Sequence, residues 1–135
     1  STVGGASGPL YGTAFMKAGQ LMAGKDAVDI NDFVEILRVS IEGVKMRGKS
    51  TTGEKTMLDA MVPALAAMEG ALKAAKDPKE ILLEGVEAAE DGVAYTKTII
   101  ATKGRASYLG ERSIGHQDPG ATSFTLMLSV IAKSL

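Results

Sequence analysis

The sequence has no cysteine, a single histidine and no long apolar run. The lack of cysteine excludes disulfides and thiol chemistry, which is compatible with a reducing compartment. No apolar run approaches the roughly 20 residues that a membrane-spanning helix needs, and Ser1 does not open a charged segment followed by an apolar one, as a secretory leader would. We therefore expect a cytoplasmic protein with no membrane partner.

An excess of charge of either sign is also missing. The chain carries 15 basic and 16 acidic residues, which leaves a net charge of -1. Surfaces that bind nucleic acid are usually strongly basic, so the balance argues against a nucleic-acid partner and leaves only a local basic pocket open. The length of 135 residues suits one domain over residues 1–135, with roughly two thirds of the unfolded surface buried.

The beginning of the sequence is unusual. A natural reading frame begins with methionine, whereas Ser1 leads almost at once into a glycine-rich segment that starts at Gly4. We expect that the chain lacks its N-terminal part. Removal of the initiator methionine before a small Ser1 is the alternative.

Apolar residues recur at helical spacing through most of the chain, and no stretch alternates convincingly with period two. This pattern predicts an all-α fold. Asp77-Pro78 and Asp118-Pro119 are typical helix starts, since the aspartate caps the first turn and the proline fits its first position. The expected helices cover residues 9–23, 29–47, 57–72 with a kink or restart at Pro63, 77–104, and 118 onward.

One side of each expected helix is apolar and is predicted to face a common core. The residues of these apolar sides are Leu10, Ala14, Ala18, Leu21, Phe33, Leu37, Ile41, Val44, Met57, Met61, Leu65, Met68, Leu72, Leu82, Val86, Ala89, Val93, Ile100, Phe124, Met127, Leu128 and Ile131.

The connection formed by residues 103–120 is too specific for a linker. It contains basic side chains, several glycines, the only histidine and an Asp-Pro-Gly helix start. An ordinary helix connection needs about 2 to 8 residues. A long connection of this composition is typical of a functional loop.

Two helix starts are candidate anion sites. The segment Gly4-Gly5-Ala6-Ser7-Gly8-Pro9 allows close backbone approach, and the helix after it presents free N–H groups and its positive dipole end, while the Ser7 hydroxyl can contact a phosphate oxygen. Asp118-Pro119-Gly120 is a second such start, and the planar guanidinium of Arg105 could clamp a diphosphate beside it. The alternative for the first segment is a flexible turn before a capped helix. The alternative for the second start is a helix cap with no ligand, and for Arg105 it is a solvated side chain.

The connection from Arg47 to Thr56 is the third candidate. Gly48, Lys55 and several hydroxyl groups suit a polar ligand, and Met57 offers a soft apolar wall for an aromatic base. The alternative is a surface loop followed by a core methionine.

His116 has no second histidine and no cysteine near it, so a metal site is poorly supported and no metal ligand is assigned. An unperturbed imidazole suits general-base chemistry, but we interpret His116 as a structural residue that holds the loop. The scattered aspartates are interpreted mostly as helix caps or solvated groups, and no catalytic residue is assigned. These aspartates are Asp26, Asp29, Asp32, Asp59, Asp77 and Asp91.

Motifs at three separated places resemble one family. The two long motifs run from Gly4 to Thr13 and from Gly104 to Ser123, and between them Arg47-Gly48-Lys49 and Gly53-Glu54-Lys55-Thr56-Met57 also match. The chain resembles the nucleotide-binding L subunit of dihydroxyacetone kinase from Val3 to the last helix. The resemblance implies a barrel of antiparallel helices, with ADP or ATP bound among the loops at one end.

The resemblance also implies the contacts to the nucleotide. Ala6 and Ser7 would bind phosphate, and Gly48 and Met57 would line the nucleotide pocket. Arg105 would reach the phosphates. The start of the last helix would close the site with Asp118, Pro119 and Gly120. The family carries its magnesium-binding aspartates upstream of the Gly-Gly-Ala-Ser motif, so the Mg²⁺ ligands are expected from a segment absent from this chain.

The implied function is a phosphotransferase subunit in glycerol metabolism. In the branch linked to the phosphotransferase system, a phosphohistidine on the M subunit rephosphorylates resident ADP, and the phosphoryl group then passes to dihydroxyacetone held by the K subunit. A separate short chain favours this branch, with the K and M subunits as partners. The alternatives are the L-type domain of an ATP-dependent kinase and a non-catalytic helical module that signals nucleotide or phosphorylation state to a regulator. The oligomeric state stays open, with a homodimer among the choices.

Overall fold

The computed structural model describes residues 17–21, 29–48, 52–100, 110 and 114–135, and these residues form helices and turns without a strand. The long helices are α2 (Ile30–Gly48), α3 (Leu58–Lys73), α4 (Pro78–Thr96) and α5 (Pro119–Lys133), and residues 17–21 are also helical. The all-α prediction is confirmed. Across these described ranges, no helix is long and apolar enough to cross a membrane.

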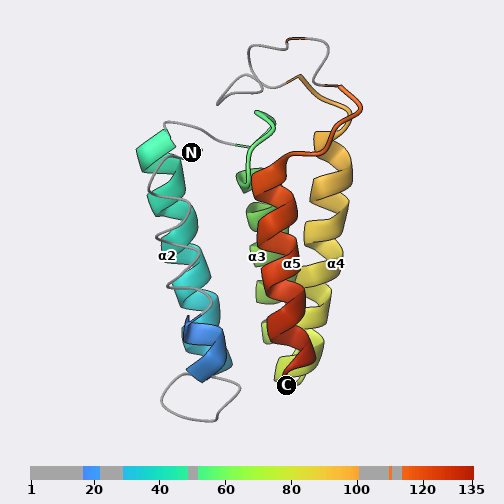
Figure 1. Ribbon diagram of the computed structural model, residues 1–135. Coiled ribbons are helices and arrows are strands. Elements are labelled where there is room, and N and C mark those ends of the chain that lie inside the picture. The colour runs from blue at the N-terminus through green and yellow to red at the C-terminus, as the bar shows by residue number, and fades with distance from the viewer. Residues whose placement is uncertain (1–16, 22–28, 49–51, 101–109, 111–113) are drawn as a thin grey trace.

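The helices form a bundle in which each successive long helix runs antiparallel to the one before it (Figure 1). Helix α3 packs against α2, α4 and α5, and α5 also packs against α4. The end of α2, the start of α3, the end of α4 and the start of α5 therefore lie at one end of the bundle, the upper end in Figure 1. This end is called the site end below.

The core is built from the apolar sides that the helical spacing predicts. On α2, the predicted side is buried against the bundle: Phe33, Leu37, Ile41 and Val44. Met61 and Met68 of α3 are buried with it, while Leu65 and Leu72 pack at its edge. Burial of each large apolar side chain is worth about 1.5–3 kcal/mol relative to exposure, so packing of these faces, more than helix propensity, holds the bundle together.

The capped helix starts are where the sequence predicts them. The Asp77 carboxylate accepts the Glu80 backbone N–H at 2.9 Å, and the Asp118 carboxylate accepts the Ala121 N–H at 2.8 Å. Each carboxylate satisfies one of the amides that the first helical turn leaves without a partner. Hydrogen bonds to the backbone also lower the pKa of the exposed Asp77 carboxyl.

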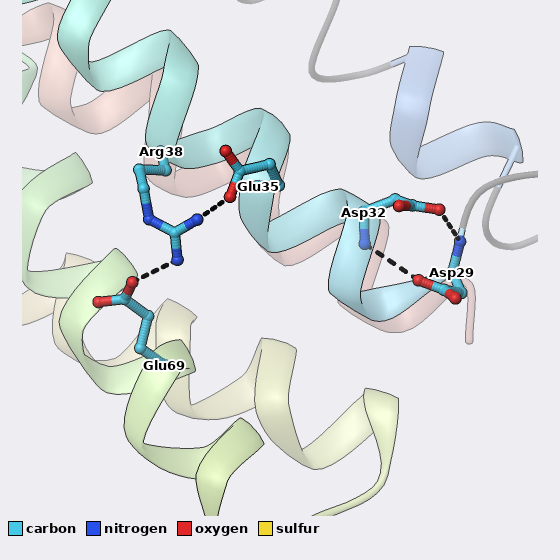
Figure 2. A network of polar contacts seen from close by, with 5 residues as sticks. All are labelled: Asp29, Asp32, Glu35, Arg38 and Glu69. Atoms are coloured by element: carbon cyan, nitrogen blue, oxygen red, sulfur yellow. Dashed lines mark hydrogen bonds and ion pairs between the residues drawn. The ribbon is translucent and has the colours of Figure 1, made fainter.

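Helix α2 begins with a pair of reciprocal aspartates (Figure 2). The Asp32 backbone N–H donates to Asp29 Oδ1 at 3.0 Å, and the Asp29 N–H lies 3.5 Å from Asp32 Oδ2. Two turns further along, Arg38 pairs with Glu35 and reaches across to Glu69 of α3, with 2.5 Å between Arg38 Nη2 and Glu69 Oε2. These groups are partly solvated, and such exposed pairs contribute about 0–1 kcal/mol. Of these interactions, the Arg38–Glu69 pair joins α2 to α3.

The predicted end of the fourth helix at Gly104 is wrong, because α4 ends at Thr96. Residues 98–100 are all β-branched, which lowers helix propensity. The Gly115 N–H donates to the Lys97 carbonyl at 2.6 Å, so a terminal carbonyl of the helix is satisfied from the following segment. The chain leaves α4 two turns earlier than the apolar pattern predicts.

Two predicted core positions are also wrong. Ile100 lies beyond α4 and is 40% exposed, and Leu21 is 36% exposed. The helical segment 17–21 instead turns Ala18 and Gly19 inward, and a β-carbon at Gly19 would lie 2.6 Å from Cδ1 of Ile131. The remaining expected residues of the first helix, Leu10 and Ala14, lie outside the described residues.

Pro63 does not restart α3, since the helix is continuous from Leu58 to Lys73. A proline has no N–H to donate to the carbonyl four residues before it, which here belongs to Asp59. That carbonyl faces Gly92 of α4: a β-carbon at Gly92 would lie 1.9 Å from the Asp59 oxygen. The absence of a side chain at Gly92 therefore permits close approach of α3 and α4 at the site end.

Replacement of Gly92 by alanine should destabilise the protein by about 3 kcal/mol or more, because the clash is with backbone and side-chain rotation cannot relieve it. Gly70 of α3 is the matched control, since a β-carbon there meets nothing within 4 Å. Gly70→Ala should stabilise the helix by up to roughly 1 kcal/mol through helix propensity. Urea unfolding of both variants measures the difference, and equal free energies of unfolding would contradict the packing described.

Candidate functional site

The loop before α3 is organised by Asp59, whose side chain is only 3% exposed. Asp59 Oδ1 accepts the Gly53 N–H at 2.6 Å, and Oδ2 accepts the Thr56 N–H at 3.1 Å. The Thr56 hydroxyl oxygen accepts the Leu58 N–H at 3.2 Å. Both carboxylate oxygens are thus used to fold residues 52–57 over the start of α3.

The start of α5 is fixed by the end of α4. The Asp118 N–H donates to the Thr96 hydroxyl oxygen at 3.0 Å, and the same hydroxyl donates to the Val93 carbonyl at 2.5 Å. Thr96 is completely buried, so water does not compete with these bonds. The Asp118 carboxylate meanwhile caps α5, as described above. The Thr96 hydroxyl therefore connects the end of α4 to the start of α5 by hydrogen bonds.

Met57 and Gly120 meet at this junction. A β-carbon at Gly120 would lie 3.3 Å from Met57 Cβ and 3.5 Å from its Cε. Glycine lets the first turn of α5 approach the methionine side chain. Two residues that are 63 positions apart in the sequence, one from each predicted loop, are therefore side by side.

Lys55 places a buried positive charge in the same region. Its side chain is 4% exposed, and its Nζ donates to the Ile99 carbonyl at 3.4 Å. Burial lowers the pKa of Lys55, and attraction to the Asp118 carboxylate opposes that shift.

Burial likewise raises the pKa of Asp118, and the negative charge of Asp59 adds to this effect. Hydrogen bonds from the Ala121 and Gly120 amides, together with the charge of Lys55, act in the opposite direction. Asp59, Asp118 and Lys55 therefore place charged groups of both signs in a largely buried setting at the site end.

The structure brings several of the sequence-predicted site residues to this end. Met57, Asp118 and Gly120 lie at the junction, Pro119 is the first residue of α5, and Gly48 is the last residue of α2. His116, in the turn before α5, is exposed. The other three predicted nucleotide contacts lie outside the described residues: Ala6, Ser7 and Arg105.

The sequence interpretation missed the role of Asp59, which it grouped with caps and solvated aspartates. The available signal was Thr56-Met57-Leu58-Asp59, a Ser/Thr-x-x-acidic pattern typical of a capping box. The reach of the Asp59 carboxylate back to the Thr56 N–H is one half of that motif. The burial of Asp59 carried no such signal, because it arises from packing between elements that are separate in the sequence.

Within the ranges that the structure covers, no group of three or more histidine or acidic side chains is arranged to hold a metal ion. Three other features of the site end suit an anion and an apolar ring. The start of α5 supplies a positive dipole end, Lys55 supplies a charge, and Met57 supplies a polarizable apolar surface.

Known proteins are similar to this chain over nearly its whole length. The sequence profile of the DAK2 domain matches residues 1–133. The ADP-binding subunit DhaL of the PEP-dependent dihydroxyacetone kinase of Escherichia coli is 42% identical over 98% of this chain, which spans 63% of that subunit. The ADP-binding subunit DhaL of the PTS-dependent dihydroxyacetone kinase of Lactococcus lactis is 45% identical over 98% of the chain, which spans 62% of it. The L-erythrulose 1-kinase of Mycolicibacterium smegmatis is 33% identical, and the chain spans 23% of it.

Removal of the Asp59 carboxylate should disorder the loop before α3. Asp59→Ala leaves the Gly53 and Thr56 amides without their acceptor and is expected to cost about 3 kcal/mol, whereas Asp59→Asn keeps one acceptor oxygen and should cost less. Urea unfolding gives the free energies, and hydrogen exchange at the two amides should accelerate in Asp59→Ala. Asp91→Ala, at an exposed position of α4, should change stability by no more than roughly 0.5 kcal/mol.

The raised pKa of Asp118 predicts a dependence of stability on pH. Between its ordinary value of 3.8 and its higher folded value, the folded state binds more protons than the unfolded state, so this contribution to stability is lost as the pH rises. Asp118→Asn keeps an oxygen that can cap α5 but does not titrate. The stability of the original protein relative to Asp118→Asn should therefore fall between pH 4 and pH 7. Unfolding titrations at both pH values check this, and a relative gain for the original protein would contradict the assignment.

Proposed function

Because the chain belongs to the DAK2 domain family, we propose that it is the ADP/ATP-binding part of a dihydroxyacetone kinase. A phosphohistidine carrier, the M subunit, rephosphorylates the bound ADP. The phosphoryl group then passes to dihydroxyacetone held on the K subunit. The reaction takes place in the cytoplasm.

The observation that carries the proposal is the contact between Met57 and Gly120 at the start of α5. An adenine ring needs an apolar, polarizable surface, which Met57 supplies. A diphosphate needs donors and positive potential, which a helix start supplies. Met57 and the helix start meet both requirements side by side, and the relatives that are 42% and 45% identical to the chain are ADP-binding subunits by name.

The remaining contacts are those that the family resemblance implies. Gly48 closes α2 at the site end and lines the nucleotide beside Met57. Ala6, Ser7 and Arg105 bind the phosphates, while Asp118 and Pro119 set the direction of α5 through the cap. Mg²⁺, held by ligands outside this chain, offsets the negative charge of the phosphates when bound.

The source of the phosphoryl group separates two forms of the proposal. The higher identity to separate ADP-binding subunits favours a phosphohistidine carrier. The 33% identity to an L-erythrulose 1-kinase keeps a domain of an ATP-dependent kinase as the second candidate.

The intact protein, mixed with K and M subunits, should support turnover with the phosphocarrier as donor. Turnover with free ATP alone would establish the second candidate.

The intact protein should bind ADP in a magnesium-dependent manner, and Arg105→Ala should weaken this binding at least tenfold, the order expected for loss of a charge-assisted contact of about 1.5–3 kcal/mol. Arg112→Ala removes the same side chain from the same loop at a position with no assigned contact. It should leave the dissociation constant within about twofold. Calorimetric titration measures both. Absence of ADP binding, or unchanged phosphotransfer in Arg105→Ala, would refute the proposal.

A further inference from the structure

Lys55 joins three segments that meet at the site end. It belongs to the loop before α3, its Nζ donates to the Ile99 carbonyl beyond the end of α4, and its charge attracts the Asp118 carboxylate at the start of α5. A lysine only 4% exposed is uncommon, because burial of an ammonium group is costly unless partners compensate. The burial of this ammonium group therefore indicates a specific electrostatic role for Lys55.

The backbone at Lys55 supports the same conclusion. Its φ of 60° lies in the left-handed region, where a residue with a β-carbon is strained and glycine or asparagine is preferred. The Asp59 carboxylate holds this conformation from both sides, through the Gly53 and Thr56 amides. Strain of this kind persists where the surrounding structure enforces it and is concentrated at functional sites.

The negatively charged groups near Lys55 indicate what its positive charge does. Burial raises the pKa of Asp118 and the negative charge of Asp59 adds to that effect, so two carboxylates lie near each other at the end where the phosphates of ADP are proposed to bind. A multiply negative diphosphate is repelled by both carboxylates. Of the lysines in the described ranges, Lys55 is the buried one, and the negative charge of Asp118 acts on it.

We propose that Lys55 is a positioning residue for the diphosphate: from the loop before α3 it offsets the carboxylates of Asp59 and Asp118 and ties the end of α4 to the site. The inference rests on the proposed function, since it takes ADP as the ligand. It assigns to Lys55 an effect on the charged part of the nucleotide, separate from the apolar contact that Met57 makes with the base.

The test compares ADP with adenosine, which has the same base and ribose but no phosphate. Lys55→Met removes the charge, keeps an unbranched side chain and retains the same backbone strain. It should weaken ADP binding by the intact protein about tenfold, the order expected for loss of one nearby charge at the effective dielectric of a protein. Adenosine binding, measured by competition, should change less than about twofold, since it carries no charge for Lys55 to attract.

Lys97→Met is the matched control. Lys97 is exposed immediately after α4 at the same end of the bundle, so its loss changes net charge equally while solvent screens the effect. The ratio of ADP to adenosine affinity should stay within about twofold of that of the original protein.

Equal weakening of ADP and adenosine by Lys55→Met would show a purely structural role and overturn the inference, as would an unchanged affinity for both. An equal change of the ratio in Lys97→Met would overturn it too, because the effect would then be one of net charge. If the original protein does not bind ADP, the proposed function fails first and the inference with it. If the original protein binds ADP and only the ratio test fails, the proposed function stands.

Discussion

The buried carboxylate of Asp59 and the backbone carbonyl of the same residue act on opposite sides of one helical turn. The carboxylate folds residues 52–57 through the Gly53 and Thr56 amides, while the carbonyl, to which Pro63 cannot donate, faces the bare backbone of Gly92. The position of the loop and the separation of α3 and α4 are thereby determined at the same point.

The rest of the site end depends on this arrangement. Helix α4 delivers Thr96, whose buried hydroxyl receives the Asp118 N–H and fixes where α5 begins. The first turn of α5 then brings Gly120 against Met57, which the Asp59-supported loop presents. The proposed nucleotide contacts are thus held by backbone and hydroxyl hydrogen bonds on rigid helix ends, which is how a binding geometry is kept precise.

The sequence predicted what local chemistry decides. Asp77-Pro78 and Asp118-Pro119 mark true helix starts because a cap and a proline act within one turn. The core side of α2 follows from spacing alone. The end of α4 was missed because a contact from Gly115 and a β-branched run outweigh the apolar pattern beyond Thr96. The burial of Asp59 and Lys55 was missed because it is created by helices far apart in the sequence, which periodicity does not reveal. The predicted contacts at Ala6, Ser7 and Arg105 stay predictions, since they lie outside the described residues.

In the proposed function, the nucleotide binds at the end of the bundle where α4 ends and α5 begins. Amide chemical-shift mapping of the isotope-labelled intact protein with ADP and Mg²⁺ tests it most directly. The largest shifts are expected at residues 53–57 and 118–122, with little change around Lys73 and Lys79 at the opposite end of the bundle (Figure 1). Saturable shifts confined to that opposite end, or to the exposed side of α2, would contradict it.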